Sequence, residues 1–168
     1  MVIDLKQVFE IESEAVALDH KMDLTDYPLW GNTPFVSPVQ IKGGIRNRAG
    51  VVTLEAEVRY LLSFPCDRCL RQVEREYSFT ALHTLVSELA GEDDETFVLL
   101  PEMKLELDEL ILSDILLELP TKLLCKKSCK GLCPTCGTDL NESTCDCGNR
   151  PTENALSGLL ALLDEDSE

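Results

Sequence analysis

The clearest strand in the sequence reads VTLEAEVRYLLSFPCDRC, residues 52–69. Its apolar side chains fall on every second position, which is the period of a strand that buries one face. The apolar face consists of Val52, Leu54, Ala56, Val58, Tyr60, Leu62 and Phe64. Pro65 interrupts the strand because proline cannot donate a ladder hydrogen bond, and residues 66–69 follow as a turn.

A second alternating segment follows this turn. Its apolar positions are Val73, Tyr77, Phe79, Ala81 and Leu85, and mostly polar residues lie between them. Two alternating runs that are joined by a short turn predict a long β-hairpin. The tip of this hairpin would carry the thiols of Cys66 and Cys69.

Two further strands are predicted upstream of the hairpin. Residues 16–24 alternate between apolar and polar side chains, with His20 on the apolar side, and residues 39–45 do the same. Residues 47–50, Asn-Arg-Ala-Gly, predict a turn after this strand. The proline-rich segment 25–38 predicts an extended loop, whose aromatic residues Trp30 and Phe35 we expect to pack back onto the sheet.

Downstream, helical periodicity replaces the alternation. Residues 87–96 form an acidic connection, and residues 97–100 predict a short strand. A helix is expected from Asp108, as its N-cap, to Leu119, where Pro120 ends it. The apolar stripe of this helix consists of Ile111, Leu112, Ile115, Leu116 and Leu119. A last helix is expected after Pro151, with Leu156, Leu159, Leu160 and Leu163 on one side.

These patterns predict an α+β protein. Its core would be a mainly antiparallel β sheet or a partly open barrel with two helices and a Cys-rich zinc-binding segment. We predict a β-rich domain over residues 1–124, with a helix at about 108–119, and a Cys-rich segment over 125–150 that packs on it. A C-terminal helix and an acidic tail would occupy residues 151–168.

Composition restricts the classes of function. The chain has 168 residues, of which 44% are hydrophobic, which is enough for a packed core. Its 31 acidic and 15 basic residues give a formal net charge of −16, which would repel nucleic acid from most of the surface and favours basic protein partners. The N-terminus lacks the basic leader and apolar run of a signal peptide, so we expect a cytoplasmic protein without a membrane span.

Six of the eight cysteines lie in one stretch, CKKSCKGLCPTCGTDLNESTCDC, residues 125–147. In a reducing compartment, cysteines at such spacings are metal ligands more often than disulfides. Cys133-Pro134-Thr135-Cys136-Gly137 has the form of a knuckle, in which a tight turn aims two thiolates at one ion. The sequence therefore predicts one or two Zn²⁺ ions in closed four-thiolate sites.

Two ligand pairings are compatible with the sequence. In the preferred pairing, Cys66, Cys69, Cys125 and Cys129 hold one ion, and Cys133, Cys136, Cys145 and Cys147 hold the other. In the rival, rubredoxin-like pairing, Cys66 and Cys69 join Cys133 and Cys136. A thiol redox role for the Cys66-x-x-Cys69 motif is a third hypothesis, although such motifs in thioredoxin-like enzymes open a helix rather than cap a hairpin.

Seven basic residues lie near the cysteines of the preferred first site. They are Arg68, Arg71, Arg75, Lys122, Lys126, Lys127 and Lys130. One interpretation is that they offset the thiolate charge and hydrogen-bond the sulfurs. The other is a local basic patch that contacts RNA phosphate or another partner.

The sequence offers no catalytic constellation. Its two histidines, His20 and His83, fall in separate predicted strands, which leaves little to build a histidine-based triad or a catalytic metal centre. The Lys42-Gly43-Gly44 run does not lead into a phosphate-binding loop pattern. We therefore expect a non-enzymatic protein without a small-molecule substrate.

Several of these motifs together resemble one family, the bacterial and plastid YceD proteins, in their cysteine-rich form. The resemblance runs nearly end to end. It rests on Ile3-Asp4-Leu5, Cys66-Asp67-Arg68-Cys69-Leu70, Leu119-Pro120, the run from Cys129 to Gly137, Asp139-Leu140-Asn141 and Cys145-Asp146-Cys147.

The resemblance implies a ribosome-biogenesis factor that supports the synthesis, processing or stability of 23S rRNA in the large subunit. It implies large-subunit rRNA, basic ribosomal proteins, or both, as partners. The alternative function is that of a rubredoxin-like or thiol redox metalloprotein, which would be red and iron-loaded rather than colourless. Some family members lack the second cysteine set, which implies that these four ligands matter less than the first pair.

Overall fold

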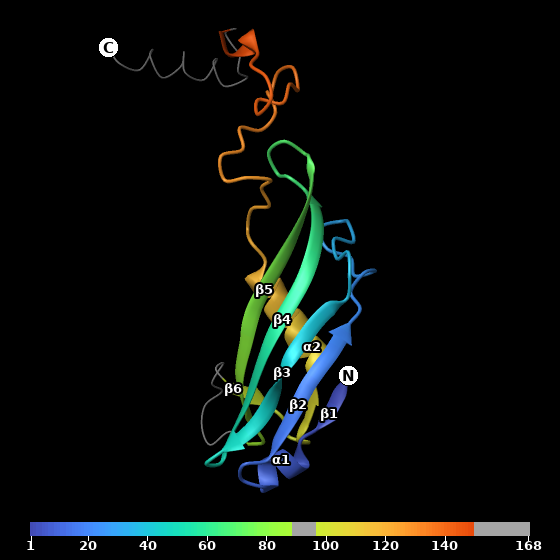
Figure 1. Ribbon diagram of the computed structural model, residues 1–168, viewed down its shortest axis with the longest axis vertical. Helices are drawn as coiled ribbons and strands as arrows, with labels where there is room; N and C mark the ends of the chain where they lie inside the picture. The colour runs from blue at the N-terminus through green and yellow to red at the C-terminus, as the bar shows by residue number, and fades with distance from the viewer. Residues whose placement is uncertain (89–96, 150–168) are drawn as a thin grey trace, which may run out of the picture. The chain divides into compact units, whose positions relative to one another are not determined.

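The computed structural model of the chain describes residues 1–88 and 97–149. These residues belong to two compact units (Figure 1). The first, the sheet unit, comprises Met1–Pro65 and Gln72–Leu123. The second, the cysteine unit, comprises Cys66–Arg71 and the chain from Leu124 onward. The predicted C-terminal helix and acidic tail lie outside the described residues.

The sheet unit contains one five-stranded sheet and one two-stranded sheet. The large sheet has the order β2-β3-β4-β5-β6, with bounds Ala15–Met22, Val39–Arg48, Val51–Pro65, Gln72–Val86 and Phe97–Leu99. All its neighbours are antiparallel except β5 and β6. The small sheet pairs β1, Val2–Asp4, with β7, Lys104–Glu106, and the helices are α1, Lys6–Glu10, and α2, Leu107–Glu118.

The unit is therefore a mainly antiparallel α+β fold, as predicted, but its large sheet is open. Strands β2 and β6 are its two edges, and they do not pair with each other, so within the described part of the chain no barrel closes. The short β6 runs parallel to β5 and pairs only with residues 84–86.

The long hairpin is formed by β4 and β5, which pair from Val52 and Leu85 to Pro65 and Gln72. Its register places the alternating apolar residues of β4 on the buried face. The tighter hairpin of β3 and β4 turns through Ala49 and Gly50, whose φ angles are 53° and 84°. Positive φ at both residues is what a two-residue hairpin turn requires, and glycine adopts it without strain.

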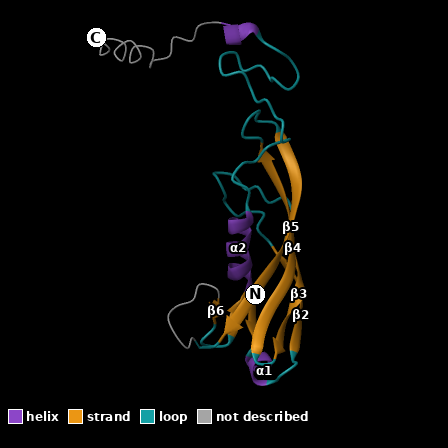
Figure 2. Cartoon of the chain, turned by 90° about the vertical axis from the view of Figure 1, so that its left-hand side faces the viewer, coloured by secondary structure: helices purple, strands orange, loops and turns teal. Residues whose placement is uncertain are grey.

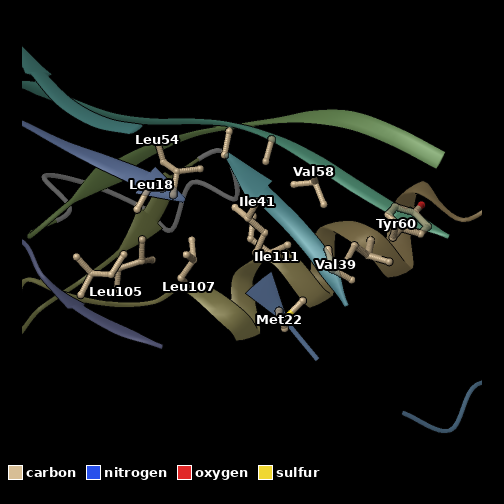
Figure 3. Close-up of a cluster of buried hydrophobic side chains, with 14 of the residues drawn as sticks. Leu18, Met22, Val39, Ile41, Leu54, Val58, Tyr60, Leu105, Leu107 and Ile111 are labelled. Carbon is tan, nitrogen blue, oxygen red and sulfur yellow. The ribbon is translucent and has the colours of Figure 1, made fainter. Parts of the chain in front are cut away.

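Helix α2 packs on one face of the large sheet, as Figure 2 shows. Leu107, Ile111 and Ile115 are fully buried and meet the apolar residues of the strands, such as Ile41 and Leu54 (Figure 3). The buried stripe is narrower than the sequence predicts, because Leu116 is 38% exposed. The core of the sheet unit therefore lies between α2 and one sheet face.

The start of α2 differs from the prediction. The helix begins at Leu107, and its N-cap is Glu106, which makes no side-chain cap hydrogen bond. Asp108 lies in the first turn, where its carboxylate accepts hydrogen bonds from the Met1 ammonium group and from Nε2 of His20, the latter at 2.9 Å. At the other end, Leu119 is extended before Pro120, as expected for a residue that precedes proline.

The loop over residues 25–38 follows its prediction only in part. Phe35 is buried and contacts the rings of Tyr27 and Tyr60. Trp30, in contrast, is 56% exposed, so the expectation that it packs back onto the sheet is wrong.

In the described part of the chain, no helix is both long enough and apolar enough to cross a bilayer.

Candidate metal centre

The eight cysteines gather in two groups of four within the cysteine unit. The first cysteine group consists of Cys66, Cys69, Cys125 and Cys129, and the second of Cys133, Cys136, Cys145 and Cys147. In each group all four sulfur atoms lie within 4.8 Å of one another. The rival, rubredoxin-like pairing is not seen, because Cys133 and Cys136 lie in the other group from Cys66 and Cys69.

The sulfur spacing fits a tetrahedral metal site. Sγ of Cys66 lies 3.9 Å from Sγ of Cys129, and Sγ of Cys69 lies 3.7 Å from Sγ of Cys125. Four sulfurs at ~2.3 Å from a central zinc ion are about 3.8 Å apart, whereas a disulfide requires about 2.05 Å. All eight cysteines are free of disulfides. Each group could therefore hold one metal ion, and the identity of that ion is a proposal.

The tip of the long hairpin positions the first two ligands. The Cys66 N–H donates to the Arg71 carbonyl at 2.9 Å, and the Leu70 N–H donates to the Cys66 carbonyl at 2.9 Å. Leu70 has a positive φ of 59°, which lets the chain reverse directly after Cys69. This turn directs both thiols to the same side. In thioredoxin-like enzymes the Cys-x-x-Cys motif begins a helix, whereas here no helix begins at this motif.

The segment that follows Cys129 is held against this tip by two hydrogen bonds with Arg68. The Leu132 N–H donates to the Arg68 carbonyl at 3.0 Å, and Nη1 of Arg68 donates to the Cys129 carbonyl at 2.6 Å. Gly131 lies between them with φ of 79°, and a Cβ at this position would lie 3.0 Å from the Arg68 carbonyl oxygen. A glycine at this position therefore permits the close approach of the two segments.

The second group is built from a knuckle of the predicted form. The Gly137 N–H donates to the Cys133 carbonyl at 2.9 Å, and the Cys133 N–H donates to the Thr138 carbonyl at 2.8 Å. Gly137 has φ of 74°, which the turn requires and glycine tolerates. Cys145 precedes and Cys147 lies within a short 3-10 helix, Asp146–Asn149, which brings the second pair of sulfurs to the knuckle.

Within each group, the pKa values of neighbouring thiols are shifted in opposite directions. Burial acts to raise the pKa of the Cys66 thiol, but backbone N–H groups outweigh burial and lower this pKa to about 6. Burial, together with the neighbouring sulfurs, raises the pKa of Cys125 to about 12. The two directions reflect the short distances between the sulfurs, because two thiolates so close together repel each other. A divalent cation would remove this repulsion and allow all four thiols to ionise.

The second group likewise contains one thiol with a lowered pKa and one with a raised pKa. Hydrogen bonds from the side chain and then the backbone of Thr138 lower the pKa of Cys136 to about 6. The hydrogen bond with Cys136, with burial as the next cause, raises the pKa of Cys147 to about 12. Both groups therefore have the electrostatic character of thiolate sites for a cation.

The two groups differ in their access to solvent. In the first, Cys66, Cys69 and Cys129 are all buried, with exposed fractions of 0%, 7% and 1%. In the second, Cys133 is buried, but Cys136 is exposed and Cys145 and Cys147 are half-buried. An ion in the second group would be easier to reach from solvent.

The predicted basic residues are divided between the two units. Arg68 and Arg71 are held inside the cysteine unit, Arg68 by the Cys129 carbonyl and Arg71 by ion pairs with Asp139, at 3.2 Å, and Glu142. Lys126, Lys127 and Lys130 are exposed in the same unit. Arg75 and Lys122 belong to the sheet unit. A contact of these residues with RNA or with a partner remains a prediction.

One residue of the site, Asn141, was not predicted from the sequence. Its Nδ2 donates to Sγ of Cys129 at 3.4 Å and to Oδ1 of Asp139 at 2.6 Å, and its Oδ1 accepts from the Lys130 N–H at 2.9 Å. Asn141 lies in the loop between the cysteine pairs of the second group, yet it supports a ligand of the first. The sequence marked Asn141 only as part of the Asp139-Leu140-Asn141 motif of the family resemblance, and this motif gave no role in a metal site.

The fold and the site together define an α+β protein whose hairpin tip and cysteine-rich segment form two potential thiolate metal sites. The chain belongs to the YceD family, since the family model described as large ribosomal RNA subunit accumulation protein YceD matches residues 54–163. The resemblance predicted from the motifs is thereby confirmed.

One relative is a protein of Arabidopsis thaliana, the large ribosomal RNA subunit accumulation protein YCED homolog 1, chloroplastic. It is 24% identical over 178 residues, which cover 88% of this chain and 53% of the relative. The chain thus spans about half the length of that relative. No solved structure matches the chain.

Proposed function

We propose that this protein is a non-catalytic factor that supports the accumulation of large-subunit rRNA, through the synthesis, processing or stability of 23S rRNA in the cytoplasm. The observation that carries the proposal is the pair of four-cysteine groups in a chain of the YceD family. The groups give the family's role a physical basis, since they can turn a polar, loop-rich segment into a rigid module.

Zinc is the ion that suits these groups. Four thiolates complete the coordination of Zn²⁺, so no position remains open for water or substrate, and such sites stabilise structure rather than catalyse. The ligands would be Cys66, Cys69, Cys125 and Cys129 for one ion and Cys133, Cys136, Cys145 and Cys147 for the other. An iron-loaded, red protein would instead favour the rubredoxin-like alternative, so metal analysis of the purified protein separates the two.

The exposed lysines of the cysteine unit are the candidates for partner contact. Lys126 and Lys127 lie between two ligands of the first group, so a bound ion would order the chain that carries them. Arg68 and Arg71 already have partners within the unit and serve its structure. The lysines could contact phosphates of large-subunit rRNA, while the acidic surface elsewhere could contact basic ribosomal proteins.

Co-sedimentation with precursors of the large subunit tests the proposal. We expect wild-type protein to co-sediment and Lys126→Glu with Lys127→Glu to reduce the bound fraction. The matched control is Lys6→Glu with Lys104→Glu, which changes the net charge equally at exposed positions of the sheet unit. Equal binding of both variants would remove the lysines from the mechanism. Unchanged large-subunit rRNA levels after depletion of the protein would overturn the proposed function.

A further inference from the structure

The large sheet has one covered and one open face. Helix α2 lies on one side of it only (Figure 2), and the polar phase of the strands points to the other side. On this open face, strand β3 carries Lys42, Arg46 and Arg48. These are three of the 15 basic residues of a chain with a net charge of −16.

None of these three residues forms an ion pair with any residue in the described parts of the chain. Lys42 has acidic neighbours on both sides, since Asp19 and Glu57 are its cross-strand partners. The cross-strand partners of Arg46 are instead Ala15 and Thr53, and Arg48 pairs with Val51. At the arginine end of β3 the directly opposite residues therefore carry no negative charge, and Glu55, which is opposite Gly44, is a diagonal neighbour of Arg46 on β4.

A groove of about 470 Å³ lies beside these arginines. Small residues line it, among them Ala15, Ala17, Gly43 and Gly44, together with Arg46 and Arg48. Gly44 shares the strand phase of Arg46 and Arg48, so the absence of a side chain there leaves room on the open face beside the arginines. Position 43 cannot carry one, since a Cβ there would lie 2.1 Å from the Glu55 carbonyl oxygen. The packing of β3 against β4 therefore requires glycine at position 43.

We propose that this groove binds the phosphate backbone of an RNA strand, with Arg46 and Arg48 as the contacting residues. The guanidinium fork matches phosphate oxygens, and residues two apart on a strand lie on the same face within about 7 Å. The small floor allows a nucleic-acid backbone to approach the sheet closely. The choice of RNA rests on the proposed function, whereas the choice of a polyanion rests on the charge of the groove.

The groove suits a polyanion better than a small free anion. Asn47, the one buried polar residue in the described part of the chain, also lines the groove, but its Nδ2 already donates to the Val8 carbonyl at 2.8 Å and to the Phe9 carbonyl at 3.5 Å. A small anion would therefore meet only exposed arginines and remain screened by water and salt. An RNA strand gains from several such contacts at once, because it releases condensed counterions. Glu55, which is opposite Gly44, limits the groove on its β4 side.

The test uses the full chain, loaded with zinc, and a labelled single-stranded RNA 12-mer as the probe. We expect the double variant Arg46→Glu, Arg48→Glu to weaken RNA binding by about tenfold or more. The slope of log affinity against log salt concentration should also fall by about 1.4, since each lost phosphate contact accounts for about 0.7. The charge-matched control, Lys6→Glu with Lys104→Glu, should change affinity by less than about twofold. Arg46→Gln with Arg48→Gln should reproduce the loss with less disturbance of the strand.

Two results would overturn the inference. One is an RNA affinity of the arginine variants equal to that of the control. The other is that inorganic phosphate displaces the RNA at a far lower ionic strength than chloride does. This result would indicate that the groove is a site for a small anion. If the arginine variants show the first result and still co-sediment with the large-subunit precursor, the groove is not an RNA site. The proposed function then remains intact. The proposed function itself fails if wild-type protein does not associate with that precursor and its depletion leaves large-subunit rRNA unchanged.

Discussion

Asn141 donates a hydrogen bond to Sγ of Cys129 at 3.4 Å, although it belongs to the loop between the cysteine pairs of the second group. The two cysteine groups are therefore linked by more than the short segment between them. Asp139 strengthens the link, since its Oδ1 accepts from both the backbone and the side chain of Asn141. A metal ion in one group should thus favour the geometry of the other.

The first prediction concerns this link. Asn141→Ala should weaken zinc binding at the first group by roughly 10- to 100-fold, because hydrogen bonds to a ligand orient it and stabilise its charge. Competition with a zinc chelator in a Cys136→Ser, Cys147→Ser background would measure the first group alone. Thr144→Ala, an exposed position in the same loop, is the matched control. Equal affinities for the two variants would show that the Asn141 contact is incidental.

The second prediction concerns metal removal. We expect about two zinc ions per chain and a biphasic release to excess chelator, with the fast phase from the second group because Cys136 is exposed. Cys147→Ser should abolish the fast phase and leave the slow one. A single phase of release, or loss of the slow phase in Cys147→Ser, would contradict the different accessibility of the two groups.

The third prediction is a pH dependence of the sheet unit. Burial acts to raise the pKa of Asp108, but hydrogen bonds from the Met1 ammonium group and His20 outweigh it and lower this pKa below its usual value. The stabilisation is therefore present above the unfolded pKa of about 3.9 and is lost as the pH falls through the lower folded value. Asp108→Asn should lower the unfolding temperature near neutral pH but not at strongly acidic pH.

Thermal unfolding of both proteins across this range checks the prediction. The effect should be modest, since Asp108 is 37% exposed and partly screened by solvent. Asp26→Asn removes the same charge at an exposed position and serves as the control. A difference between wild type and Asp108→Asn that grows toward acidic pH would have the wrong sign for this mechanism.

The fourth prediction concerns the core under α2. Ile111 is fully buried, whereas Leu117 on the same helix is 84% exposed. Ile111→Ala should lower the free energy of unfolding by roughly 2–5 kcal/mol, because it removes buried methyl groups and leaves a cavity. Leu117→Ala should change it by no more than about 0.5 kcal/mol. Denaturant unfolding measures both, and similar losses would mean that α2 packs differently.

The fifth prediction concerns the two glycines of β3. Gly43→Ala should destabilise the sheet unit by roughly 1–3 kcal/mol or more, because its Cβ would lie 2.1 Å from a backbone oxygen of β4 that cannot easily move. Gly44→Ala should cost less, since its closest contact would be 3.1 Å, to the Val16 carbonyl oxygen. Thermal unfolding would rank the two variants, and the reverse order would contradict the observed packing of β3.

Much of the sheet unit could be predicted from the sequence because its long strands bury one face. Alternation located β2, β3, β4 and β5, and it assigned the buried phase of β4 correctly. The elements missed were β1, α1, β7 and the 3-10 helix Asp146–Asn149, of three, five, three and four residues, which are too short to show a period. The N-cap of α2 was misplaced by two residues, from Glu106 to Asp108, because Asp108 has the chemistry of an N-cap but uses its carboxylate to bind His20.

The sequence by itself determined which residues have metal-binding chemistry, since cysteine spacing and glycine in tight turns are local properties of the chain. It left the assignment of sulfurs to groups open, because the second part of the sheet unit, Gln72–Leu123, lies between Cys66 and Cys125 in the sequence. Only the tertiary structure brought the hairpin tip to the later cysteines and placed Asn141 against Cys129. The groove beside Arg46 and Arg48 was likewise decided by strand pairing, because its shape depends on which strands lie next to the two glycines.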